Sequence, residues 1–185
     1  MIPSNLEALR AAIRDAARQA FEALRKDHPF ENFYYYALVT TEDALRPGPS
    51  ASSTAGLDRI VQTHKTAGYQ LEHADLRWSE ADSPYNLYAD HFFAEVERLF
   101  LQDGDHRKWP ASLYQDEVRI RWEAMEMAMR DLDRSGFFGT GADRHQVVIN
   151  VVAPGDEPES MLIERARRLN PPESLQQLIR DLCQP

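Results

Sequence analysis

The sequence contains almost no cysteine and no long hydrophobic run, and each absence excludes certain classes of protein. Its only cysteine, Cys183, lies two residues from the C-terminus, so neither an intramolecular disulfide nor a cysteine-based metal site can form. No stretch approaches the roughly 18 consecutive apolar residues of a membrane span. Residues 1–7 lack the basic and apolar regions of a signal peptide. These observations predict a soluble protein of the cytoplasm that does not contact a membrane.

Motifs for catalysis or metal binding are also missing. The six histidines are scattered, and none belongs to a His-x-x-x-His or Glu-x-x-His pattern. No Gly-x-Ser-x-Gly nucleophile motif occurs. A glycine-rich run at 136–141 precedes an expected strand and contains no lysine, whereas phosphate-binding loops follow a strand and the P-loop ends in Gly-Lys-Ser/Thr. We therefore interpret the run as a helix end and a turn, and we expect no catalytic residue, no cofactor and no metal.

Negative charge exceeds positive charge, and the excess is concentrated in one segment. The 30 acidic and 21 basic residues give a formal net charge of -9, which disfavours nucleic acid as a partner and favours a basic protein. Residues 72–105 contain nine acidic and only two basic residues, so this segment carries most of the net charge. Aromatic residues are interleaved with these carboxylates. Rigid rings beside charge of one sign are typical of a protein interface, where the rings anchor the partner and the charges steer it.

From this segment we select five candidate partner-binding residues, namely Glu80, Asp82, Tyr85, Tyr88 and Asp90. They would form an acidic docking surface for a basic protein. The other interpretation of the same segment is a solvated face whose aromatic side chains point into the core. The sequence favours neither interpretation over the other.

Hydrophobic periodicity predicts several helices. In the first, apolar residues recur at helical spacing from Leu6 to Leu24, after a capping-box pattern that starts at Ser4 and before a stop at His28-Pro29. The same reasoning predicts helices between Ser53 and Gly68, from Asp90 to near Gly104, from about Asp116 to Arg134, and on both sides of the Asn170-Pro171-Pro172 break, with Pro158 as a first helical position.

Strands are fewer than helices. Residues 33–41 combine aromatic and β-branched side chains with apolar residues on both faces, which predicts a central strand covered on both sides. Residues 146–153 are apolar enough for a second buried strand, residues 75–79 are a candidate strand, and the proline-rich turn at 46–50 borders a candidate edge strand. Because no linker or repeat interrupts the chain, we predict one α+β domain over residues 1–185, with a small central mixed or antiparallel sheet packed by several helices.

Three segments carry a resemblance to a known family. They are the aromatic strand at 33–38, the run Leu76-Arg77-Trp78-Ser79, and residues 132–139, Leu-Asp-Arg-Ser-Gly-Phe-Phe-Gly, which lead to Arg144. Through them the chain resembles, over nearly its whole length, the bacterial domain-of-unknown-function 4303 family. That family often has a second tryptophan soon after Arg-Trp-Ser, where this chain has Glu-Ala-Asp-Ser-Pro-Tyr at 80–85. The family has no established catalytic residues to carry over. Families of this type are suspected of neutralising toxins in bacterial polymorphic toxin systems, so the resemblance implies an immunity-type protein.

Three hypotheses therefore follow. The first is a non-catalytic protein-binding domain of the immunity type, which neutralises a basic toxin through the acidic, aromatic segment. The alternative is an uncharacterised hydrolase or nucleotide-dependent enzyme with a pocket near Arg77, Trp78, Asp133 and Arg144. A purely structural homo-oligomeric module is a third hypothesis, and the sequence leaves the oligomeric state open.

Overall fold

The computed structural model describes residues 4–155 and 158–183, and the statements below refer to these residues. The helices and strands, in which η marks a 3-10 helix, follow in the order α1 Leu6–Asp27, β1 Phe33–Val39, β2 Gly48–Ser53, α2 Thr54–Thr66, α3 His73–Leu76, η1 Asp90–Phe93, α4 Ala94–Leu101, η2 His106–Lys108, α5 Ala111–Arg134, α6 Gly141–Arg144, β3 Val148–Val152, α7 Glu159–Leu169, η3 Pro172–Leu175 and α8 Gln176–Leu182.

The sheet has three strands in the order β2-β1-β3. β1 pairs antiparallel with β2 and parallel with β3, so that Tyr36 lies opposite Ala51 on one side and Ile149 on the other. Parallel pairing of β1 with β3 requires a long crossover, and the chain supplies it as β2 and the helices α2 to α6. The fold is therefore α+β with a mixed sheet, as the sequence predicts.

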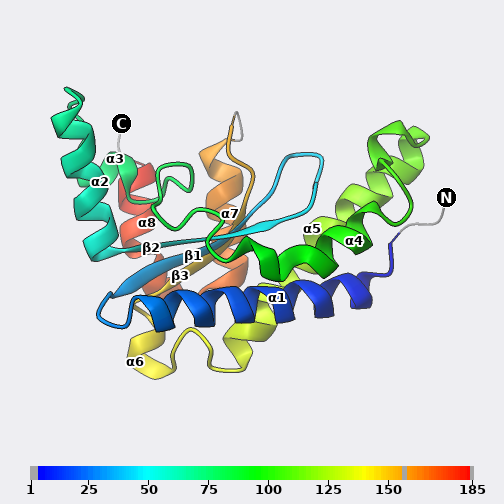
Figure 1. Cartoon of the computed structure of the whole chain (residues 1–185), viewed down its shortest axis with the longest axis horizontal. Helices are drawn as coiled ribbons and strands as arrows, with labels where there is room; N and C mark the ends of the chain where they lie inside the picture. Colours follow the sequence, from blue (N-terminus) through cyan, green and yellow to red (C-terminus); the bar gives the residue numbers. More distant parts are fainter. Residues whose placement is uncertain (1–3, 156–157, 184–185) are drawn as a thin grey trace.

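Helices cover both faces of the sheet (Figure 1). Side chains alternate along β1, so Tyr36 and Leu38 pack in the core cluster that contains residues of α1 and α5. Tyr35 and Ala37 pack in a second cluster, which contains residues of α7 and α8. All four side chains are at most 1% exposed. Burial of a large apolar side chain contributes about 1.5–3 kcal/mol, which explains why the strand with the most aromatic sequence occupies the centre.

Polar side chains close the outer edge of β3. Asn170, at the end of α7, accepts a hydrogen bond of 2.8 Å from the backbone N–H of Ile149 and donates one of 2.7 Å to its carbonyl. Arg165 of α7 donates a 2.7 Å hydrogen bond to the Val151 carbonyl. An edge strand leaves such backbone groups unpaired, and here the helix that follows the strand satisfies them. The helix stop at Asn170 thus also protects the sheet.

The predicted strand at 75–79 is wrong. Residues 73–76 form α3, because the Asp75 carboxylate accepts a 2.7 Å hydrogen bond from the Glu72 backbone N–H and closes a helical turn. Leu76 and Trp78 are both buried, and their spacing of two residues imitates the alternation of a strand.

Helix ends also differ from the predictions in detail. Asn5, rather than Ser4, caps α1, through a 3.1 Å hydrogen bond from the Ala8 N–H. The long helix α5 begins at Ala111, before the predicted start. Pro158 is the N-cap of α7 rather than its first helical residue. Among the described helices, none combines the length and the apolar character that a membrane crossing needs.

Candidate functional site

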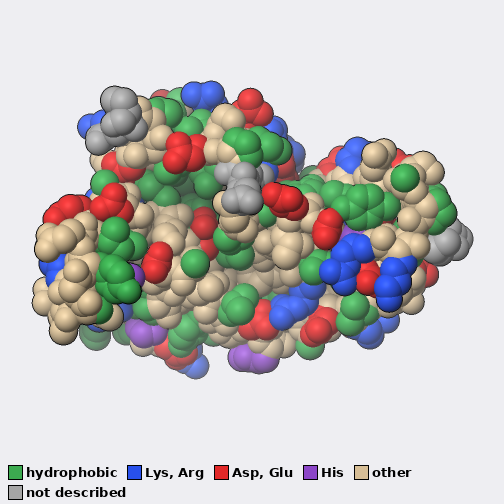
Figure 2. All heavy atoms as spheres, turned by 90° about the horizontal axis from the view of Figure 1, so that it is seen from above, with side chains coloured by type: hydrophobic (Ala, Val, Ile, Leu, Met, Phe, Trp, Pro, Cys, Tyr) green, Lys and Arg blue, Asp and Glu red, His purple; other side chains and the backbone are tan. Residues whose placement is uncertain are grey.

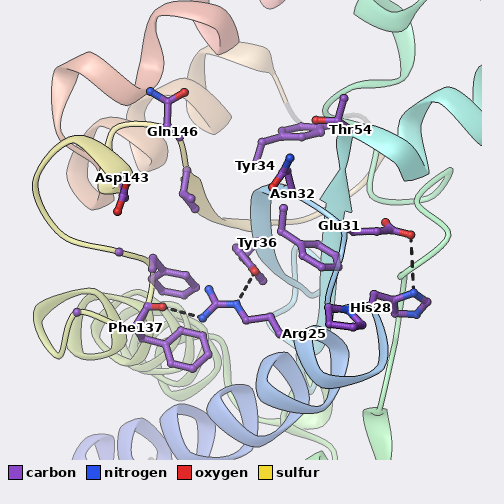
Figure 3. Close-up of a pocket in the computed structure, with 16 residues that line it drawn as sticks. Arg25, His28, Glu31, Asn32, Tyr34, Tyr36, Thr54, Phe137, Asp143 and Gln146 are labelled. Atoms are coloured by element: carbon purple, nitrogen blue, oxygen red, sulfur yellow. Dashed lines mark hydrogen bonds and ion pairs between the residues drawn. The ribbon is translucent and has the colours of Figure 1, made fainter.

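A cavity of about 770 Å³ opens at the end of the sheet where the parallel strands β1 and β3 begin. Its walls come from the last turn of α1, the turn into β1, the start of α2, the glycine-rich loop after α5, and residues 143–147. Figure 3 shows the side chains of these segments facing one another across the cavity. Its volume lies within the range of about 300–1,000 Å³ that is common for small-molecule sites.

Arg25 of α1 lies at the base of the cavity (Figure 3). Its Nε donates a 2.7 Å hydrogen bond to the Tyr36 hydroxyl, and one terminal nitrogen donates a 2.8 Å bond to the Phe137 carbonyl. The guanidinium also lies over both rings, 5.0 Å from the centre of Tyr36 and 4.4 Å from that of Phe137. All these partners are neutral, and no carboxylate of a described residue forms an ion pair with Arg25. The cation is therefore held in place without a counter-ion.

The loop after α5 brings Phe137 and Phe138 to the cavity. The helix ends where Gly136 adopts a left-handed φ of 78° and the Phe137 N–H donates to the Leu132 carbonyl at 3.1 Å. Gly139 has a φ of 102°, and a Cβ atom there would lie 3.1 Å from the Arg144 backbone nitrogen. Both positions therefore favour glycine. The run 136–141 does end a helix and form a turn, and it also lines the cavity.

Glu31 anchors the opposite wall. Its carboxylate accepts hydrogen bonds from the Ser53 hydroxyl, from the Tyr85 hydroxyl at 2.5 Å and from Arg59 at 3.0 Å, and it lies 3.7 Å from the His28 ring. Burial raises the pKa of Glu31, but these hydrogen bonds lower it more, so the pKa is below its usual value. This carboxylate is ionised at neutral pH, and Arg59 neutralises it.

Polar side chains that have no hydrogen-bond partner among the described residues complete the walls. Figure 3 shows Asp143 and Gln146 on one side of the cavity and Asn32 on the other. The Asp143 carboxylate is exposed and makes no hydrogen bond or ion pair with a described residue. The cavity thus contains one uncompensated cation, Arg25, and one uncompensated anion, Asp143.

The candidate partner-binding residues do not form one exposed surface. Glu80 is 7% exposed and accepts a 2.7 Å hydrogen bond from the buried Tyr35 hydroxyl. Tyr85 is 3% exposed. The carboxylate of Asp90 is paired with both terminal nitrogens of Arg46 at 2.7 Å. These three residues support the fold through their side-chain contacts.

The other two candidate residues are half-buried. Asp82 lies 3.3 Å from the His64 ring, and Tyr88 donates a 2.7 Å hydrogen bond to Asp27. Figure 2 shows Asp and Glu side chains dispersed singly among hydrophobic and polar ones on the face that it presents. The acidic side chains visible on this face therefore form no continuous negative patch.

The four residues of the alternative pocket form two pairs. Trp78 donates a 2.9 Å hydrogen bond from its indole nitrogen to Asp181, and Arg77 lies 3.2 Å from the same carboxylate. Arg144 donates a short hydrogen bond to Asp133. None of the four lines the cavity described above.

Both pairs instead support its walls. The Tyr34 ring lines the cavity, and its hydroxyl donates a 2.9 Å hydrogen bond to the Arg77 carbonyl. On the other side, the backbone of Arg144 is in close contact with Gly139. Two of the segments that carry the family resemblance, 33–38 and 132–139, therefore supply residues to the wall of one cavity, and the third, 76–79, contacts it through Tyr34. Sequence reasoning selected neither Arg25 nor Asp143. Of the segments that line the cavity, it considered only the glycine-rich run at 136–141 as a possible phosphate-binding loop.

No group of three or more His, Cys, Asp or Glu side chains that could hold a metal ion occurs among the described residues. The model of the family called Domain of unknown function (DUF4303) matches residues 13–171. The chain therefore belongs to this family, which confirms the resemblance seen in the sequence. No curated protein and no solved structure matches the chain.

Proposed function

We propose that the chain is a non-catalytic protein-binding domain, an immunity-type protein that neutralises a basic toxin in the cytoplasm of a bacterium. The net charge of -9 supports a cationic partner, because charge of one sign accelerates the approach of the opposite sign. Neutralisation of a toxin requires only a complementary surface, and no catalytic machinery. The enzymatic alternative receives no support from its four residues, which are engaged with each other, with Asp181 and with the backbone.

The contact surface that the geometry supports best is the corner between α1 and β1, together with the neighbouring segment 85–90. Phe30 is 97% exposed in the turn after α1, and Leu87 is 50% exposed. The two segments are in contact, because the His28 ring lies 5.8 Å from the Tyr88 ring. An exposed aromatic side chain is a typical anchor of a protein interface, and Leu87 adds an exposed apolar side chain on the adjoining segment. The exposure of Phe30 is the observation that carries the proposal.

The backbone of the segment 85–90 gives further support. Leu87 and Ala89 have left-handed φ values of 55° and 56°, and they flank Tyr88. A non-glycine residue in this conformation costs about 1–3 kcal/mol, and such strain is concentrated at functional sites. The tyrosine between them is half-buried and donates a hydrogen bond to Asp27, so the strained turn is fixed against the last turn of α1.

In this proposal the anchors and the charges have separate tasks. Asp90 is paired with Arg46 and contributes little attraction at short range. The net charge of the whole chain steers a basic partner from a distance, and the side chains of Phe30 and Leu87 hold it after contact.

The proposal is tested by capture of partners from the native cell, including any toxin-like protein encoded next to this chain, followed by affinity measurements with the purified partner. The change Phe30→Ala should weaken binding at least tenfold, because a buried aromatic anchor contributes more than about 1.4 kcal/mol. Tyr69→Ala is the matched control, since Tyr69 is 61% exposed but lies at the end of α2. Rising salt should slow the association of both variants with the partner. Equal loss in the two variants, or no loss for Phe30→Ala, would exclude this surface.

A further inference from the structure

The cavity at the start of β1 and β3 contains one fixed positive and one free negative charge. Arg25 has no carboxylate partner among the described residues, and its guanidinium is held between two rings and two neutral oxygens. Asp143 faces the same cavity from the short helix α6, and its carboxylate has no described partner. The third charged group, Glu31, is already neutralised by Arg59. A ligand that meets both free charges must itself be dipolar.

The rest of the lining indicates what lies between the two charges of such a ligand. The rings of Phe33, Tyr34 and Phe137 form apolar surfaces, and the amides of Asn32 and Gln146 supply both donors and acceptors. Amide groups pair well with the peptide backbone, and the rings suit an apolar side chain. A cavity of about 770 Å³ is large for a single free amino acid and has space for two or three residues.

We propose that this cavity binds a short peptide with free ends, whose carboxylate is bound by Arg25 and whose ammonium group is bound by Asp143. Arg25 is suited to the first task because its guanidinium is cationic and can donate a charge-assisted hydrogen bond to a carboxylate. Its second terminal nitrogen has no described hydrogen-bond acceptor and is available for the ligand. A nucleotide fits less well, because its phosphates would place several negative charges beside Glu31 and Asp143 with only one arginine to meet them. The inference is independent of the protein-binding function proposed above.

Isothermal titration calorimetry with the whole chain tests the proposal. The probes are a panel of di- and tripeptides with aromatic, aliphatic and polar side chains, each in free, N-acetylated and C-amidated form, and ATP is included as a competing ligand class. Free peptides should bind, and blocking either end should weaken binding at least tenfold. Failure of every free peptide to bind, equal binding of free and blocked forms, or tighter binding of ATP would overturn the proposal.

Variants assign each end of the peptide to its residue. Asp143→Asn should remove the preference for a free amino end while the preference for a free carboxylate remains, and Arg25→Gln should do the reverse. The matched controls are Asp15→Asn and Arg14→Gln, whose side chains pair with each other on α1 at 2.8 Å and do not line the cavity. Thermal melting checks that each variant is folded. Asp143 is exposed, so its variant keeps the test decisive if Arg25→Gln unfolds. Unchanged end preferences in a folded Asp143→Asn variant would refute the assignment.

Discussion

The buried ion pair in α5 provides the sharpest test of how this fold is held together. Glu117 is 0% exposed and Arg121 is 3% exposed, and Arg121 Nε lies 2.5 Å from the Glu117 carboxylate. The same carboxylate accepts hydrogen bonds of 2.7 and 2.6 Å from the backbone N–H and the hydroxyl of Ser4. Arg121 donates further bonds to the carbonyls of Ala44 and Phe100, at 3.3 and 2.9 Å. The pair thus connects α5 with the start of α1, the loop after β1 and the end of α4.

The change Arg121→Met should destabilise the protein strongly, because it leaves the Glu117 carboxylate buried with only Ser4 as a partner. Removal of one member of a buried ion pair costs about 3–5 kcal/mol. For a chain of this length each kcal/mol lowers Tm by about 2–4 °C, so the expected loss is about 6–20 °C. The double change Glu117→Leu with Arg121→Met should recover most of the loss, since an apolar pair of similar volume is often neutral in place of a buried ion pair.

Urea and thermal unfolding of the wild type, both single variants and the double variant form a complete cycle. A loss below about 1 kcal/mol for Arg121→Met, or a double variant no more stable than the single one, would refute the reasoning. The pH dependence gives a second check. Burial raises the pKa of Glu117, but the bonds from Ser4 and Arg121 lower it more, so its pKa is below the usual 4.5. Its contribution to stability is therefore present above about pH 4.5 and disappears as the pH falls through the folded-state pKa. The double variant should lack this acid-dependent component.

Two further changes test the walls of the cavity and the edge of the sheet. Gly139→Ala should lower Tm more than Gly68→Ala, because both residues have a positive φ but only at position 139 would the new Cβ meet backbone, 3.1 Å from the Arg144 nitrogen. Differential scanning fluorimetry measures both, and equal losses would contradict the close contact. Asn170→Leu should cost about 3 kcal/mol or more in urea unfolding, since it leaves both backbone groups of Ile149 unpaired. The control is Asn86→Leu, because Asn86 is exposed. If Asn170→Leu cost no more than this control, the backbone groups of Ile149 would have other hydrogen-bond partners.

Much of the fold could be predicted because its signals are local. The aromatic strand 33–39 is central and covered on both faces, as its composition indicates. Helix α5 ends near Gly136, which adopts a left-handed φ. Helix α7 ends before Pro171 and Pro172, which lack the backbone N–H that a continued helix needs. The prediction of a strand at 75–79 is wrong because a helical turn can also bury two residues spaced by two. Here Leu76, at the end of α3, and Trp78, just after it, are both buried. Two apolar residues are too few to distinguish the period of a strand from that of a helix.

The candidate site could not be predicted to the same extent. Which way a charged side chain points depends on groups that are distant in the sequence. Glu80 belongs to an acidic segment, yet it is buried because the Tyr35 hydroxyl donates to it. Arg25 is one of several basic residues on α1, and it differs from the others because it donates hydrogen bonds to the Tyr36 hydroxyl and the Phe137 carbonyl.

The sequence by itself determined the α+β class, the central strand, most helix ends and the family to which the chain belongs. These features follow from the period of apolar residues and from the backbone limits of glycine and proline, which act over a few residues. The tertiary structure alone decided which charges are paired, which aromatic rings are exposed and where a cavity lies. Those outcomes depend on contacts such as Arg25 with Phe137, made between residues more than a hundred positions apart, which no local pattern encodes.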